Sequence, residues 1–195
     1  PKVLAGFSRK HPGVRLELIE DSSDMLADML TERKIDLTFS CNSAFMRDFE
    51  RYSLFYDHVL LAVPAENPIN QKLARLALTA GDILNRRHLE ADCPSSSLTN
   101  FCELEYILLR PGNNLHERAI SMFQNAGFKP KVKLCLAQLA TAYHLAEESF
   151  AAAFVSDRMV RNPDTPLMFY KLDSPLTERL FYVLLPDRNY TSHAV

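Results

Sequence analysis

Two stretches of this 195-residue chain alternate strand-like and helix-like patterns, and this alternation constrains the fold more than any other feature. In the first stretch, VRLELIE (14–20) places apolar residues at every second position, which is typical of a strand. Residues 25–30 then repeat apolar residues at helical spacing, and IDLTFS (35–40) is a short apolar run of strand length. A strand, a helix and a strand this close together predict a βαβ unit with parallel strands.

The second stretch repeats the alternation over a longer part of the chain. Its predicted elements are, in order, a strand EYILL (105–109), a helix from Leu115 to Ala126 that ends before Gly127, a strand KVKLCL (131–136), a helix over 139–146 and a strand AAAFV (151–155). HVLLAVP (58–64) and RLFYVLLP (179–186) are further strand candidates. The stretch 65–97 has the weakest pattern and is expected to be irregular around a short helix near 80–84. These patterns predict an α/β fold with mainly parallel sheets.

The composition narrows the class of protein. A net charge of −2 and one short basic cluster, Arg86-Arg87-His88, give no electrostatic footprint for nucleic acid. No apolar run reaches the length of a membrane span. The four cysteines lack a C-x-x-C pair and indicate reduced thiols in a cytosolic protein, while the six histidines show no i, i+3 or i+4 pairing, so neither a metal nor a cofactor is expected.

Three stretches together resemble a known family. FSRKHPGVRLELIE with the following SSDMLADMLTERKIDLTF, then LFYDHVLLAVPAENPI, then FCELEYILLRPGNNLHERAISMFQNAGFKPKV are similar in order and spacing to the effector-binding domain of LysR-type transcriptional regulators. The resemblance covers nearly the whole chain except roughly 73–96, which looks like an insertion. It departs at Ser149-Phe150-Ala151, where the family typically has Gly-x-Gly, so that a bulky aromatic residue replaces a flexible turn.

The resemblance implies a two-lobed, periplasmic-binding-protein-like fold of type 2. Lobe I would comprise 1–56 plus 177–195 and lobe II 57–176, with crossings at Tyr56-Asp57 and Leu176-Thr177. A small polar or acidic effector would bind between the lobes, and the protein would be a cytoplasmic homodimer or tetramer, with helices 24–33 and 115–126 as candidate contacts. DNA would be bound only through an N-terminal winged helix-turn-helix that this chain lacks.

In the first lobe, the hydroxyl residues Ser22 and Ser23 precede the predicted helix. Either they cap the helix, or they hold a ligand where free backbone N–H groups attract an anion. Ser23 matches the family's effector-contacting position, and Ser22 fits a cap better. Asp21 and Asp24 argue against a negatively charged ligand at this position, because their carboxylates would repel it. Further candidates follow the strand 35–40, because ligands bind beyond the carboxyl ends of parallel strands: Ser40, Cys41 and Asn42.

In the second lobe, the loop RPGNNL offers a matching set at the start of a helix. The candidates there are Arg110, Gly112, Asn113, Asn114 and Leu115, together with Gln138 at the start of the next helix. The alternative is again a cap, because Asn114 and Glu117 have the spacing of a capping box. Arg110 would supply positive charge for an acidic ligand, or it is simply solvated.

Two other classes of function stay open on the sequence. One is an extracellular solute-binding protein of the same fold, and the other is a small α/β enzyme using an activated serine or thiol. No G-x-S-x-G, P-loop or paired-carboxylate motif supports the enzyme, so no catalytic residue is expected.

Overall fold

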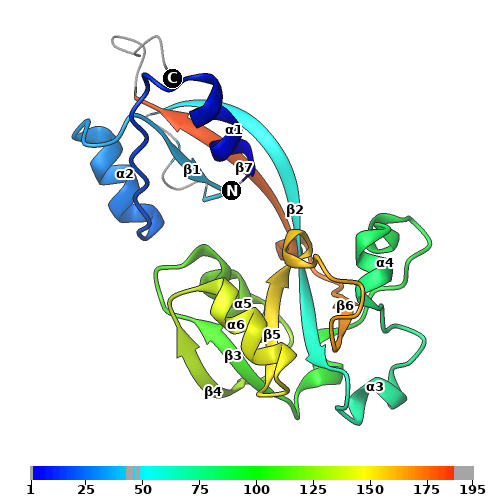
Figure 1. Ribbon diagram of the computed structural model, residues 1–195. Coiled ribbons are helices and arrows are strands. Elements are labelled where there is room, and N and C mark those ends of the chain that lie inside the picture. Colours follow the sequence, from blue (N-terminus) through cyan, green and yellow to red (C-terminus); the bar gives the residue numbers. More distant parts are fainter. Residues whose placement is uncertain (1, 43–45, 47–48, 187–195) are drawn as a thin grey trace. The chain divides into compact units, whose positions relative to one another are not determined.

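A computed structural model describes residues 2–42, 46 and 49–186, and its chain divides into two compact units (Figure 1). The first unit comprises Pro1–Tyr52 and Val183–Val195, and the second comprises Ser53–Tyr182. Two strands, β2 (Glu50–Pro64) and β7 (Glu178–Leu185), each pass from one unit into the other. The lobe boundaries expected from the family resemblance stay predictions.

The first unit contains two helices and a short strand. Helix α1 is Lys2–Lys10, α2 is Ser23–Thr31 and β1 is Thr38–Ser40, which adjoins β7 in the sheet. The strand predicted over 14–20 is wrong: this segment has no regular secondary structure and forms no ladder with any described residue. Alternation of apolar residues produces a strand only where a neighbour pairs with its backbone, and that condition is not visible in a local pattern.

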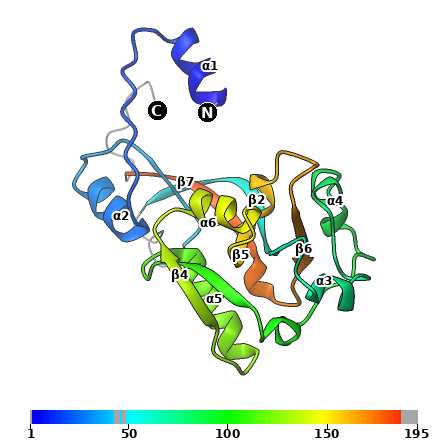
Figure 2. The ribbon, with the colours of Figure 1, turned by 60° about the horizontal axis from the view of Figure 1, so that its bottom comes forward.

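The second unit is built on the sheet order β2-β5-β3-β4, with β6 also paired to β2 (Figures 1 and 2). Its strands β3 (Glu105–Leu109), β4 (Lys131–Leu136) and β5 (Ala152–Ser156) confirm the predicted strands within one residue. Strand β3 pairs in parallel with β4 and β5, whereas β2 is antiparallel to β5 and to β6 (Leu167–Lys171). The sheet is therefore mixed: parallel pairing is limited to the strands that helical crossovers connect.

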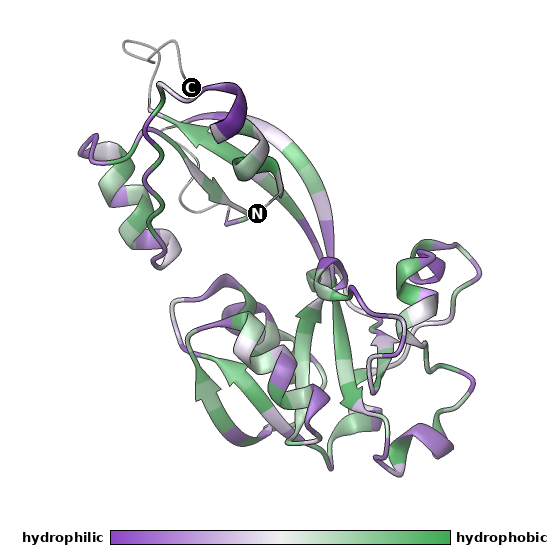
Figure 3. Ribbon diagram, viewed as in Figure 1, coloured by the Kyte–Doolittle hydropathy of each residue, from purple (hydrophilic) through white to green (hydrophobic). Residues whose placement is uncertain are grey.

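Two helices form those crossovers, α5 (Asn114–Asn125) between β3 and β4, and α6 (Leu139–Glu147) between β4 and β5. The helical spacing predicted a buried face of Leu115, Ala119, Met122, Phe123 and Ala126; all but the half-buried Ala126 are buried. The centroid of the Phe123 ring lies 4.8 Å from that of Tyr106 and 5.5 Å from that of Phe154. Strands β3 and β5 are green along most of their length in Figure 3, as expected for strands that are covered on both faces. Tyr106 donates its hydroxyl hydrogen to the Phe101 carbonyl at 2.7 Å, so the buried phenol is satisfied.

The insertion-like segment 73–96 is more ordered than its sequence pattern indicated. The expected short helix is α4 (Ala80–Leu84), α3 (Ile69–Lys72) precedes the segment, and a 3-10 helix, Arg87–Leu89, follows α4. Isolated bridges join Leu78 to Phe169 and Ser96 to Leu172. A second 3-10 helix, Leu98–Phe101, leads into β3. Thus long-range pairing to the β6 region fixes a segment that lacks a local pattern.

Three helices end in the same backbone motif with different residues at its left-handed position. Arg33, Gly127 and Ser149 follow α2, α5 and α6 with φ of 57°, 76° and 60°. In each case the N–H of the next residue donates to the carbonyl five residues earlier, as Phe128 does to the Phe123 carbonyl at 3.3 Å. Gly127 confirms its predicted place, and Ser149 occupies a conformation that favours glycine, at the point where the chain departs from the family's Gly-x-Gly.

Within the described residues, every helix is too short or too polar to span a bilayer.

Candidate functional site

Ser22 and Ser23 lie at the start of α2, where the sequence placed them. Ser22 is the N-cap by backbone position, but its hydroxyl makes no capping bond, so the predicted side-chain cap is wrong. The Ser22 hydroxyl and the backbone N–H groups of Asp24 and Met25 instead hold the pKa of the Asp24 carboxyl below its ordinary value. A carboxylate of the protein therefore already lies against the first turn of α2, which makes this helix end a poor site for a ligand anion.

The last residue of β1, Ser40, and the two residues that follow it differ in burial. Ser40 is buried, and its hydroxyl accepts the backbone N–H of Asn42 at 3.1 Å. Cys41 and Asn42 are half-buried. The predicted run from Ile35 to Ser40 is shorter as a strand, because β1 begins only at Thr38.

In the second unit, Asn113 rather than Asn114 caps α5. Its side-chain oxygen accepts the Leu115 N–H at 2.9 Å, and Glu117 reaches back to accept the Gly112 N–H at 3.2 Å. The predicted capping box of Asn114 and Glu117 is therefore wrong: the cap is one residue earlier, and Glu117 accepts from the residue before it, Gly112, whose φ is 88°. The side-chain NH2 group of Asn113 makes no hydrogen bond to the described residues and keeps its capacity to donate.

The neighbours of this cap have different surroundings. Asn114 accepts from the Arg118 guanidinium at 3.0 Å, and Arg118 also donates to the Leu176 carbonyl at 2.7 Å. The Leu115 side chain is buried in the core, so only its backbone is available to a ligand. Arg110 is exposed and has no ion-pair partner among the described residues. Gln138 is exposed at the N-cap position of α6 and makes no side-chain cap there.

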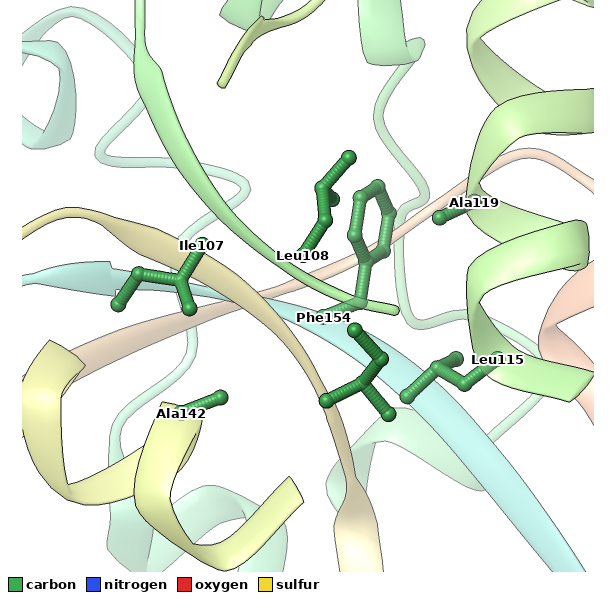
Figure 4. Close-up of a pocket in the computed structure, with 7 residues that line it drawn as sticks. Ile107, Leu108, Leu115, Ala119, Ala142 and Phe154 are labelled. Atoms are coloured by element: carbon green, nitrogen blue, oxygen red, sulfur yellow. The ribbon is translucent and has the colours of Figure 1, made fainter. Parts of the chain in front are cut away.

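Two cavities in the second unit lie away from these polar candidates. The first is an apolar void of about 10 Å³ between β3, α5, α6 and Phe154 (Figure 4). A void of this size without polar partners is a packing defect rather than a ligand site. The second, of about 550 Å³, is lined by residues around Glu103, Lys133 and Phe150. Of the predicted site residues, only Leu115 lines either cavity.

Sequence reasoning missed a buried ion pair that joins the two crossing strands. Asp57 on β2 accepts from the Arg179 guanidinium on β7, with an Nε–Oδ2 distance of 2.8 Å, and Ser156 donates its hydroxyl hydrogen to the other carboxylate oxygen. All three side chains are nearly inaccessible. The partners are 122 residues apart in sequence, so no local signal announces the pair.

A second cluster lies beside it. His58, adjacent to Asp57, and His88, in the 3-10 helix of the insertion-like segment, both approach the carboxylate of Asp157. Burial raises the pKa of the Asp157 carboxyl, but hydrogen bonds from the two histidines outweigh this effect. The resulting pKa lies well below the usual range of an aspartate. The histidines are separated from Asp157 by 99 and 69 residues, which a search for i, i+3 or i+4 spacing does not detect.

A family model described as the LysR substrate binding domain matches residues 1–195. The chain belongs to this family. The match confirms the resemblance seen in the sequence, and nothing in it favours a secreted solute-binding protein.

Curated relatives of this LysR substrate-binding domain are transcriptional regulators by name. An uncharacterized HTH-type transcriptional regulator YcgK of Bacillus subtilis is 24% identical over 191 residues, covering 96% of the domain and 57% of the relative. The malonate utilization transcriptional regulator of Klebsiella pneumoniae is 22% identical over 182 residues, which cover 92% of the domain and 52% of the relative. The domain therefore spans a little over half the length of these relatives.

Solved structures show the same fold. The regulatory domain of Synechocystis PCC6803 CcmR in complex with 2-PG has a TM-score of 0.77 at 14% identity and covers 99% of the domain and 84% of that chain. The BenM effector binding domain with benzoate has a TM-score of 0.68 at 19% identity, and the match covers 100% of the domain and 79% of the BenM chain. These likenesses confirm the predicted two-lobed, periplasmic-binding-protein-like α/β fold.

Proposed function

We propose that this LysR substrate-binding domain is the ligand-sensing, oligomerising part of a cytoplasmic transcription regulator and has no catalytic role. The observation that carries the proposal is the family match over residues 1–195. The relatives named as HTH-type and malonate-utilization regulators extend well beyond the region matched here. We expect DNA to be bound through a winged helix-turn-helix outside this chain, and the domain to supply the response to a small molecule.

The effector is proposed to be a small polar or acidic metabolite held in the cleft expected between the lobes. Two structural neighbours, the effector-binding domains of QuiR and BenM, are complexes with shikimate and with benzoate, both carboxylates. In this chain the loop before α5 fits a carboxylate better than the start of α2 does. Arg110 is an exposed cation and the Asn113 amide keeps a free donor, whereas Asp24 already occupies the first turn of α2.

The hydroxyls of Ser22 and Ser23 would then bind the polar, uncharged part of the effector. Ser23 is the first residue of α2 and is half-buried, so its side chain is available without unfolding the helix. The groups at the end of β1 are proposed as further contacts, in keeping with ligand binding beyond the carboxyl ends of strands. They are Ser40, Cys41 and Asn42.

A homodimer or tetramer is proposed through α2 of one copy and α5 of another. Helix α2 buries Ala27 and Leu30 within its own unit and leaves Met25 about half exposed, so an apolar side chain remains for a partner. Light scattering tests this proposal, and a strict monomer at high concentration for the complete regulator would contradict it.

The site is tested by substitution at Ser23 and Arg110. Native mass spectrometry of gently purified protein first gives the mass of a retained small molecule, and calorimetry with that molecule follows. We expect Ser23→Ala to weaken binding about ten- to a hundred-fold, the equivalent of roughly 1.5–3 kcal/mol for a lost hydrogen bond to a charged group. Arg110→Gln is expected to weaken the binding of an acidic effector by at least the same factor.

Ser121→Ala is the matched control, because that hydroxyl donates within α5 to the Glu117 carbonyl at 2.8 Å. Its affinity should equal that of the unaltered domain. If Ser23→Ala lowers the melting temperature but leaves affinity unchanged, the serine belongs to the helix and not to the ligand.

A further inference from the structure

Two histidine side chains from separate segments of the second unit converge on one carboxylate oxygen of Asp157. Asp157 Oδ2 lies 3.0 Å from His88 Nε2 and 3.4 Å from His58 Nδ1. The three candidate donor atoms all lie within 4.8 Å of one another. His58 is on β2, His88 comes from the insertion-like segment, and Asp157 directly follows β5.

These separations fit a small coordination sphere. Zinc binds imidazole nitrogen and carboxylate oxygen at about 2.0–2.2 Å in a tetrahedron, which puts neighbouring ligand atoms about 3.3 Å apart. The two nitrogen–oxygen separations, 3.0 and 3.4 Å, fall on either side of that value. Two imidazoles with one carboxylate suit Zn²⁺, Co²⁺ and Ni²⁺ rather than Mg²⁺ or Ca²⁺, which prefer oxygen ligands.

The groups around the cluster are arranged as supporting contacts. The backbone N–H of His58 donates to Asp157 Oδ1 at 3.2 Å, which orients the carboxylate so that Oδ2 faces both rings. Glu178 Oε2 lies 3.9 Å from His58 Nε2, on the side of the ring away from Asp157. Metal-binding histidines usually present their second nitrogen to a carboxylate in this way.

Hydrogen bonding alone does not explain the position of His88. Its side chain is 2% exposed, and its Nδ1 atom is buried without a hydrogen-bond partner among the described residues. Buried imidazoles with a purely structural role normally pair both nitrogens. A coordinate bond through Nε2 would account for the burial of the ring against Asp157, and it would leave the proton on Nδ1.

We propose that His58, His88 and Asp157 form a binding site for a divalent transition-metal ion, with Zn²⁺ as the reference ion. The site would fasten the segment 73–96 to the strands that leave the second unit, beside the pair formed by Asp57 and Arg179. It is separate from the effector site and does not rest on the proposed function. It departs from the sequence-based expectation that no metal is bound.

The test uses the 195-residue chain, stripped with a chelator and kept reduced, and titrated with Co²⁺ and Zn²⁺. Calorimetry is expected to give one ion per chain, and Zn²⁺ is expected to raise the melting temperature. Metal affinity should fall by more than about tenfold in each of three variants, His58→Gln, His88→Gln and Asp157→Asn, because even loss of a supporting contact costs that much affinity.

His144→Gln is the matched control, because His144 is exposed and its Nδ1 pairs with Glu147 at 2.6 Å outside the cluster. It should bind metal like the unaltered chain. His58 is 24% exposed, so His58→Gln carries the test if the variant of the buried His88 does not fold. Equal affinity in the His58→Gln variant and the unaltered chain would overturn the proposal.

The visible spectrum of bound Co²⁺ separates this site from cysteine binding. Nitrogen and oxygen ligands give ligand-field bands without thiolate charge transfer, and that is the expected result. Charge-transfer absorption that persists in the His58→Gln variant would assign the metal to a thiol such as exposed Cys135 and would also overturn the proposal.

Discussion

The two units differ in how much of their apolar surface they bury. In the second unit, the rings of Tyr106 and Phe154 stack and Phe123 meets both edge-on, in one core with residues from every strand of its sheet. In the first unit, Leu18 is 75% exposed and Phe39 is 59% exposed. The buried apolar residues of the first unit are few among those described: Ala27, Leu30, Met46, Leu184 and Leu185.

The difference follows from how each unit is connected. The second unit repeats strand, helix and strand, so each crossover helix covers the sheet that its own strands build. In the first unit the segment 14–20 pairs with no described strand, and α2 contributes only two buried side chains. Hydrophobic burial is the main source of stability, so the second unit should be the more stable of the two.

Hydrogen exchange should show the largest contrast. We expect the opening free energy for amide exchange in β3 and β5 to be close to the free energy of global unfolding. For the amides of 14–20 we expect an opening free energy close to zero. Exchange read by mass spectrometry on peptides from both regions measures this difference. Protection of 14–20 comparable to that of β3 would mean that this segment is paired in solution, and the comparison would fail.

A matched pair of leucines sharpens the same comparison. Leu61 on β2 and Leu30 on α2 are both 0% exposed, so Leu→Ala removes the same atoms from each unit. We expect Leu61→Ala to cost about 4 kcal/mol and Leu30→Ala about 2 kcal/mol, because a sparse core can collapse around the missing atoms. Denaturant unfolding gives both free energies. Equal losses would show that the first unit is packed as rigidly as the second.

The sequence predicted those elements whose cause is local. EYILL, KVKLCL and the helix before Gly127 were found within one residue, because periodicity and a left-handed C-terminal residue are both readable along the chain. The strand over 14–20 failed because pairing is a property of two segments. Strand β6 and most of segment 73–96 were missed for the same reason, since their order comes from bridges such as Leu78 to Phe169.

The candidate site was predictable only in part. The helix starts at Ser23 and Asn114 were located, yet the hydroxyl of Ser22 and the register of the Asn113 cap depend on backbone angles that residue types do not fix. The clusters around Asp57 and Asp157 join residues from separate elements. Their chemistry arises from the topology of the sheet, which brings distant polar residues together without any spacing rule.

The smallest expected effect compares one helix start from each unit. Thr79 caps α4 with a full capping box: its hydroxyl accepts the Asp82 N–H at 3.1 Å, and the Asp82 carboxylate accepts the Thr79 N–H at 2.7 Å. Ser22 has the same place before α2 without any side-chain cap. Thr79→Ala should therefore cost about 1 kcal/mol, and Ser22→Ala no more than a few tenths.

The pH dependence of the Thr79 effect tests its cause. The hydroxyl and N–H of Thr79 lower the pKa of Asp82 below its ordinary value, so the box stabilises the fold above about pH 4 and is lost as pH falls through the lower, folded pKa. Denaturant unfolding of Thr79→Ala and the unaltered chain should give free energies that differ at pH 7 and converge in acid. If Ser22→Ala costs as much as Thr79→Ala, the Ser22 hydroxyl caps α2 in solution, and the two helix starts are alike after all.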